Sequence, residues 1–356
     1  MTDEQPWDDE PMQKPEPKQE PTDEMRFVSL TVDELLTEPP PQRALLTYAR
    51  RMPKGSKPQV WLPRGVVAIL SAPGGTGKSQ LCLQLAVAVA TGGYWLGLWH
   101  APEVGPVCIV AGEDSVHDIR ARLYALKLTE DEAAAVAERV HIMATSGVDA
   151  RWTDEHGAPT LAFTTLQERI AEKAPALVIL DPGARFFGPD VEVDNAQATA
   201  WIRQAEALQR LASCPTVLVA MHTRKGGGLD QNAVRGSSAL VDGARWVAAL
   251  ERVSDQSAPV DLLRIKRVKV NNCPPDDGAR TVERKSGGRI GYLDPGSWRQ
   301  WEDYQTNNKK NEGEATEAEA FDPEEAWKIA SREGTTDALS AMQDAEIRRK
   351  AGRRER

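Results

Sequence analysis

The stretch SAPGGTGKSQLCLQLAVAVATGG, residues 71–93, decides the fold of this chain. Glycines at this spacing let successive backbone N–H groups turn toward one anion, while a lysine reaches the terminal phosphates and a serine hydroxyl holds Mg²⁺. An apolar run precedes the glycines and a long helical segment follows them. The sequence therefore predicts a phosphate-binding loop between a strand and a helix. The residues expected to bind the phosphates are Gly74, Gly75, Thr76, Gly77, Lys78 and Ser79, with Ser79 also on the metal.

Around this loop, short apolar runs alternate with longer amphipathic segments, which is typical of an α/β fold with a mostly parallel sheet flanked by helices. Continuous apolar runs indicate strands that are buried on both faces. Two later segments, RTVERK (280–285) and GRIGYL (288–293), together with 262–270, predict antiparallel edge strands. The expected parallel strands are 66–70, 107–111, 140–144, 176–180 and 216–220, and the expected helices are 78–91, 116–127, 165–173 and 195–212.

The two ends of the chain differ from this core in composition. Residues 1–26 are rich in proline and acidic side chains, and such a segment is expected to be disordered. The working domain is expected over residues 27–304, followed by a polar linker over 305–320. Residues 321–356 are expected to form a short helical segment that ends in a basic tail.

Composition excludes several classes of protein. The formal net charge of −9 argues against a protein that coats nucleic acid over its whole surface, although it leaves room for DNA held by a few loops. The acidic N-terminus and the short apolar runs predict neither secretion nor membrane insertion. Four well-separated cysteines without a CxxC pair predict no disulfide and no structural zinc, so we expect a cytoplasmic protein.

Two carboxylates at strand ends are candidates for the chemistry. Asp181 follows an apolar strand and is expected to support Mg²⁺ beside the phosphates. Many P-loop ATPases place the glutamate that activates water directly after this aspartate, but here Pro182 occupies that position. The general base must therefore come from elsewhere. Glu113 lies just past another buried strand, and strand ends converge on the nucleotide site in sheets of this kind, which makes Glu113 the expected base for the attacking water. The alternative, in which Glu113 and Asp114 only cap the next helix, suits Asp114 better.

A third strand end carries His222, which is expected to sense the γ-phosphate. The segment after it, TRKGGGLDQNAVRGSS (223–238), is basic and rich in glycine. Such a segment is either a solvated surface loop or a nucleotide-sensitive arm that touches a polyanion or a neighbour's phosphate.

The order of motifs resembles the RepA-type hexameric helicases of plasmids, phages and mobile elements. The motifs are APGGTGKS, VAGEDSVHDIRARLYAL, LVILDPGARFFG, MHTRKG, RGSSALVDGARW and RVKVNN, and they cover about residues 40–300. The resemblance implies a RecA-like P-loop core that forms a six-membered ring with ATP at each subunit boundary. It also implies hydrolysis of ATP with Mg²⁺, stimulated by single-stranded DNA, and 5′ to 3′ unwinding at a replication origin.

Further residue roles follow from this resemblance alone. Arg235 and Lys269 are the candidates for a basic residue that acts across the subunit boundary. Segments 183–195 and 223–238 are expected to face DNA, with Arg185, Arg224, Lys225 and Arg235 as the binding side chains. Phe186 and Phe187 either stack on bases or pack against the next helix. Expected partners are further copies of the chain, single-stranded DNA, and a replication initiator or primase.

Two other classes of function remain open at this point. A RecA-like ATPase that does not unwind DNA could serve as a recombination mediator or as a regulatory switch that binds DNA. A small-molecule kinase is the weaker alternative, because nothing after Asp181 resembles a lid with clustered arginines.

Overall fold

The computed structural model describes residues 27–49, 59–224, 228–230, 233–255, 257–271, 273 and 278–312. It divides into two units, one up to Pro41 and one from Gln42 onward. The segment expected to be disordered, residues 1–26, and the expected helical tail, residues 321–356, lie outside the described residues.

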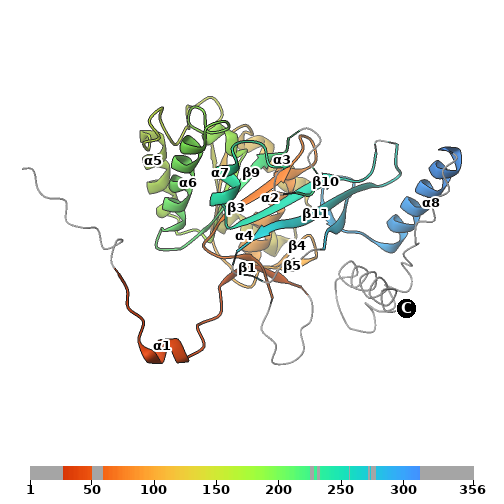
Figure 1. Ribbon diagram of the computed structural model, residues 1–356. Helices are drawn as coiled ribbons and strands as arrows, with labels where there is room; N and C mark the ends of the chain where they lie inside the picture. Colours follow the sequence, from red (N-terminus) through yellow and green to blue (C-terminus); the bar gives the residue numbers. More distant parts are fainter. Residues whose placement is uncertain are drawn as a thin grey trace, which may run out of the picture. The chain divides into compact units, whose positions relative to one another are not determined.

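The described residues of the larger unit form a nine-stranded sheet in the order β13-β12-β11-β10-β3-β9-β8-β6-β7 (Figure 1). The six strands β10, β3, β9, β8, β6 and β7 pair in parallel with one another. Strands β11, β12 and β13 are antiparallel to their neighbours. The predicted α/β fold with antiparallel edge strands is confirmed. The strands are β3 (Val67–Ala72), β6 (Val107–Ala111), β7 (Val140–Ala144), β8 (Leu177–Asp181), β9 (Thr216–His222), β10 (Trp246–Arg252), β11 (Asp261–Val270), β12 (Arg280–Arg284) and β13 (Ile290–Tyr292).

Helices cover both faces of this sheet, which gives three layers (Figure 1). Side chains alternate between the faces along each strand, so that Leu70 of β3 packs in one apolar cluster and Ile69 in the other. The first cluster includes α2 (Lys78–Thr91) and α3 (Val116–Ala125), and α4 (Glu130–Arg139) packs against α2. The second cluster includes α5 (Leu161–Ala171), α6 (Asn195–Gln209) and α7 (Ser238–Gly243).

Two strands of the sheet and one helix differ from the expectation. Strand β10 was not predicted, yet it lies beside β3 at the centre of the sheet. Strand β7 was expected to be buried on both faces, but it is the last strand in the order and all its side chains are partly or fully exposed. Helix α4 was also not predicted, although Thr129 and Glu132 form a capping box at its start.

A second, small antiparallel sheet packs on the first through tryptophans. It contains β1 (Ala44–Tyr48), β2 (Val60–Pro63), β4 (Tyr94–Trp95) and β5 (Trp99–His100). The rings of Trp61 and Trp99 stack with centroids 3.9 Å apart, and Trp246 of β10 meets Trp61 edge-on at 4.9 Å. Trp95 donates its Nε1–H to the Leu81 carbonyl in the first turn of α2, so this cluster supports the start of that helix.

The described chain ends in α8 (Pro295–Glu312), which follows the edge strands. Residues 305–312, expected to begin a linker, are helical. No helix in the described part of the chain is long and apolar enough to cross a membrane. All four cysteines are free thiols, and Cys82 and Cys108 are buried.

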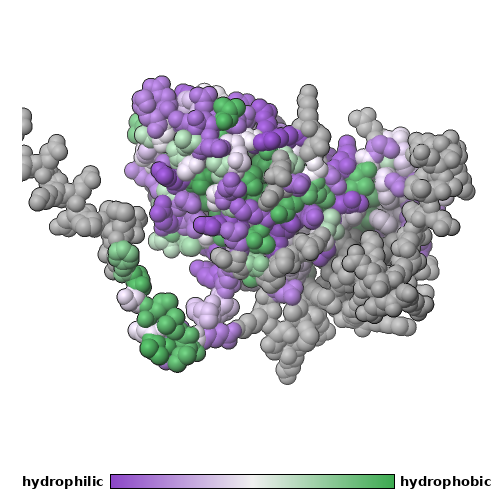
Figure 2. All heavy atoms as spheres, viewed as in Figure 1, coloured by the Kyte–Doolittle hydropathy of each residue, from purple (hydrophilic) through white to green (hydrophobic). Residues whose placement is uncertain are grey.

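The described part of the smaller unit, residues 27–41, contains α1 (Val32–Leu36), which begins at a capping box between Thr31 and Glu34. Figure 2 shows its apolar side chains together at the surface, and the exposed fraction is 63% for Leu30 and 82% for Leu36.

Candidate nucleotide-binding site

The phosphate loop connects β3 to α2, and Gly77 gives it the conformation that it needs. Gly77 has a φ of 104°, which is strained for any residue with a side chain, and it is the N-cap residue of α2. No side chain caps this helix, so its first N–H groups remain available to an anion, and the helix dipole favours negative charge there.

A pocket of about 360 Å³ lies at this loop, within the usual size range of small-molecule sites. Glu113, Asp181 and His222 reach it from the ends of β6, β8 and β9, so the structure brings together the three side chains predicted from strand ends. The lining residues are Pro73, Gly74, Gly75, Gly77, Lys78, Ser79, Gln80, Glu113, Asp114, Arg122, Asp181, Pro182 and His222.

Two charges in the pocket, the buried Lys78 and the half-buried Asp181, lack full compensation within the chain. Burial lowers the pKa of Lys78, and the negative charges of Asp181 and Glu113 offset this only in part. Burial also raises the pKa of Asp181, against a hydrogen bond from Ser79 and the charge of Lys78. A polyphosphate would compensate the ammonium and a divalent cation would compensate the carboxylate, so these residues fit a metal-bound nucleotide.

The donor set fits magnesium in particular. The Ser79 hydroxyl and the Asp181 carboxylate both line the pocket, and Ser79 is close enough to lower the pKa of Asp181. Among the described residues, no three His, Cys, Asp or Glu side chains are grouped to hold a metal by themselves. Mg²⁺ is commonly bound by one or two protein ligands together with substrate phosphates, and when bound it neutralises charge on the phosphate oxygens.

Glu113 is held by Arg185, a residue from the segment after β8. Arg185 Nε lies 3.0 Å from Glu113 Oε1, and the two side chains are 59% and 52% exposed. Gly112 makes this approach possible, because a Cβ at that position would lie 2.5 Å from the Cβ of Arg185. An ion pair this exposed is weak and can open readily.

Asp114 does not cap the helix that follows it. Ser115 is the N-cap residue of α3 and forms a capping box with Asp118. Asp114 instead accepts hydrogen bonds from both terminal nitrogens of Arg122, one of them at 3.0 Å. This pair lies in the wall of the pocket.

His222 lies where β9 ends, paired in register with Ala72 at the start of the phosphate loop. Burial lowers its pKa, and the positive charges of Lys78 and Arg235 lower it further against the charge of Glu113. A neutral imidazole can donate a hydrogen bond to a phosphate oxygen at neutral pH.

The backbone of the segment after β9 returns to His222. Arg235 donates its backbone N–H to the His222 carbonyl at 2.8 Å, and its guanidinium pairs with Glu192 at 2.9 Å. Arg224 donates to the Gly236 carbonyl at 2.8 Å. Lys225 lies outside the described residues. The two described arginines do not line the pocket.

Lys269 lies on β11, away from the pocket. Its Nζ donates to the carbonyl oxygens of Val241 and Asp242 at 2.8 and 2.9 Å, at the end of α7. A cation at this place satisfies the last carbonyls of a helix. The role that the structure displays for Lys269 is therefore within its own subunit.

Phe186 and Phe187 are packing residues. Their exposed fractions are 0% and 6%, and Phe187 meets Trp201 of α6 edge-on at 4.8 Å. Of the segment expected to face DNA, Arg185 is thus exposed, whereas the two aromatic rings are not available to stack on bases.

Two arginines near the pocket were not predicted from the sequence. Arg122 lines the pocket from α3, and Arg284 of β12 contacts the phosphate loop from outside it. Each lies in a segment where a charged residue at that spacing is equally typical of a solvated face, so nothing in the sequence pattern singled them out.

One comparison with known families bears on this site. The model of a family described as an AAA domain matches residues 21–228, which is more than half of the chain and includes the phosphate loop, Glu113, Asp181 and His222.

Proposed function

Because the chain belongs to the AAA domain family, and so is a nucleotide-hydrolysing P-loop ATPase, we propose that it is a DNA-stimulated ATPase of the RepA helicase type. It forms a ring, binds single-stranded DNA and unwinds duplex DNA in the replication of a plasmid, phage or mobile element. The bound nucleotide is ATP with Mg²⁺.

In the proposed hydrolysis, each pocket residue has one task. Lys78 and the N–H groups at the start of α2 bind the phosphates, and Ser79 and Asp181 hold the metal. Glu113 orients the attacking water and accepts its proton. His222 donates a hydrogen bond to the γ-phosphate oxygens and links them to the segment that follows.

The observation that carries the proposal is the ion pair between Arg185 and Glu113. It connects the proposed base directly to a cation on a segment that is expected to bind DNA. A DNA phosphate that attracts Arg185 would free Glu113 for the water, which gives a physical reason for ATP hydrolysis to depend on DNA.

For the role across the subunit boundary, we favour Arg235 over Lys269. The Arg235 side chain is 59% exposed and its backbone is hydrogen-bonded to His222, whereas Lys269 is engaged with the end of α7. A basic residue that reaches a neighbour's nucleotide can raise the rate by about 10³ or more.

The test combines ATPase and strand-displacement assays on the full chain. We expect single-stranded DNA to stimulate ATP hydrolysis, a forked duplex to be separated, and both activities to be lost in K78A and E113Q. The matched control is E172Q. Glu172 forms an exposed ion pair with Arg169, and neither residue lines the pocket. Stimulated hydrolysis without strand separation would instead support a recombination mediator or switch. ATPase activity indifferent to DNA would overturn the proposal.

A further inference from the structure

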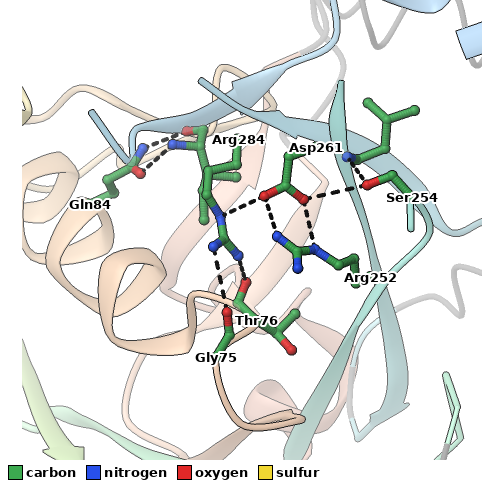
Figure 3. Close-up of polar contacts among 9 residues, drawn as sticks. Gly75, Thr76, Gln84, Arg252, Ser254, Asp261 and Arg284 are labelled. Carbon is green, nitrogen blue, oxygen red and sulfur yellow. Dashed lines mark hydrogen bonds and ion pairs between the residues drawn. The ribbon is translucent and has the colours of Figure 1, made fainter. Parts of the chain in front are cut away.

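Arg284 of β12 contacts the main chain of the phosphate loop at Gly75 and Thr76 (Figure 3). Its Nη2 donates a short hydrogen bond to the carbonyl oxygen of Thr76, and its Nη1 lies 3.5 Å from the carbonyl oxygen of Gly75. Arg284 does not line the nucleotide pocket, and it lies beyond the residues that match the AAA domain.

The contact with Thr76 fixes the orientation of one peptide group. In a planar trans peptide the C=O and N–H bonds point in opposite directions. A guanidinium that binds the Thr76 carbonyl therefore turns the N–H of Gly77 away from itself. Gly77 lines the pocket and is the N-cap residue of α2, where main-chain N–H groups bind anions, so we take this N–H as one that a phosphate would contact. Without this donor, the orientation of the Thr76–Gly77 peptide group would be less restricted.

Arg284 is itself held by the carboxylate of Asp261. Its Nε lies 3.5 Å from Oδ2 of Asp261, and the exposed fractions of the two side chains are only 22% and 26%. Arg252 of β10 donates to both oxygens of the same carboxylate, at 2.9 and 2.5 Å. Although burial alone would raise the pKa of Asp261, these two arginines and Ser254 lower it, so the carboxylate stays charged.

A second contact fixes the same edge of the sheet to α2. The side-chain amide of Gln84 donates to the Ile290 carbonyl at 2.6 Å and accepts from the Ile290 N–H at 2.8 Å (Figure 3). The side chain of Ile290 also lies against the loop, since a Cβ on Gly77 would be 3.1 Å from its Cδ1. The pair β12 and β13 is thus placed rigidly enough to position Arg284.

We propose that Arg284 is a positioning residue for nucleotide binding, which presents the Gly77 N–H to the phosphates and is held in place by Asp261 and Arg252. Its contribution is preorganisation of the loop, because Arg284 does not line the pocket in which the nucleotide would bind. The consequence is a split in the kinetic constants. Loss of Arg284 weakens the binding of ATP and ADP and raises KM for ATP, while kcat changes much less.

The experiment measures the Kd of Mg-ADP and Mg-ATPγS, together with kcat and KM, for the wild type, R284M, R284K and D261N. We expect R284M to weaken both nucleotides by about tenfold, the size of one hydrogen bond to a charged group. R284K keeps the charge but not the planar fork, so it should recover only part of the loss. D261N should cause a smaller loss, and R284M combined with D261N should bind no worse than R284M alone.

R289M is the matched control. Arg289 belongs to the same hairpin and also donates to a main-chain carbonyl, that of Leu126 at 3.1 Å, but this carbonyl is at the end of α3 and not in the phosphate loop. We expect R289M to bind nucleotide as the wild type does. If R284M does not fold, R284K compared with R289M makes the same test. Unchanged Kd values in folded Arg284 variants, or an equal loss of nucleotide affinity in R289M, would overturn the proposal. K78A tests separately whether the loop binds nucleotide.

Discussion

Arg185 Nε lies 3.0 Å from Oε1 of Glu113, so a cation after β8 restrains the carboxylate that we propose as the base for the attacking water. Both side chains are more than half exposed, and the pair is accordingly weak. A weak restraint is suited to being released by a competing anion.

The first prediction concerns this pair. Replacing Arg185 by Met should raise the ATPase rate measured without DNA, by at most about fivefold given the strength of exposed ion pairs. The same variant should show a smaller stimulation by single-stranded DNA, because the base is already free. R169M removes an arginine from a comparable exposed pair with Glu172 and should leave both rates unchanged. A basal rate in R185M that is equal to or below that of the wild type would show that Arg185 does not restrain Glu113.

The second prediction separates Lys269 from Arg235. In K269M, the carbonyls of Val241 and Asp242 lose their donor, so the free energy of unfolding should fall by about 1 kcal/mol. R235M breaks only an exposed pair with Glu192 and should unfold like the wild type. Its DNA-stimulated kcat should nevertheless fall by about 10³ while nucleotide binding is retained, as expected for a residue that acts across a subunit boundary.

Urea unfolding and steady-state ATPase assays on both variants check this assignment. The opposite result, a stable but inactive K269M and an active R235M, would transfer the role to Lys269.

The sequence predicts best where local signals are strong. Helix α2 begins at Lys78 and ends at Thr91 as expected, because Gly77 and Gly92 flank it in the left-handed conformation. The strands at 107–111 and 140–144 also have the predicted bounds. At the pocket, the positions of Glu113, Asp181 and His222 follow from the rule that parallel strand ends converge.

Elements that depend on distant partners were missed. Strand β10, with the sequence WVAALER, contains alanine, leucine and glutamate, which favour helices, and becomes a strand because it pairs with β3 on one side and β11 on the other. The small sheet has strands of two to five residues, which are too short for a periodic signal. The role that we propose for Arg284 depends on its contact with the phosphate loop, which lies more than 200 positions earlier in the chain. No local sequence pattern indicates this contact.

The third prediction concerns the tryptophan cluster beneath the small sheet. Trp61 is 1% exposed and its ring contacts those of Trp95, Trp99 and Trp246. W61A should lower the free energy of unfolding by about 3–5 kcal/mol, the cost of removing a buried aromatic side chain. Y124A removes an aromatic ring that is 76% exposed and should change it by no more than about 0.5 kcal/mol.

Urea unfolding followed by circular dichroism gives both values, since tryptophan fluorescence would itself be altered. A loss in W61A no larger than that in Y124A would mean that the small sheet is not part of the cooperative core.

The last prediction is a pH dependence that comes from His222. Burial and the charge of Lys78 lower its pKa in the folded chain below the ordinary value of 6.5. Below pH 6.5 the unfolded chain therefore binds more protons at this residue than the folded chain does, so its contribution makes stability rise with pH up to about 6.5 and stay level above it.

H222Q lacks this contribution. In nucleotide-free protein, the wild type should lose more stability than H222Q when the pH falls from about 7.5 to 5.5, as measured by urea unfolding at each pH. His141 has a lowered pKa as well, because of its burial and the charge of Lys173, and H141Q gives the size of a histidine effect away from the pocket. Equal losses in the wild type and H222Q would show that His222 takes up its proton as easily in the folded chain as in the unfolded one, and that no desolvated neutral imidazole faces the phosphate site.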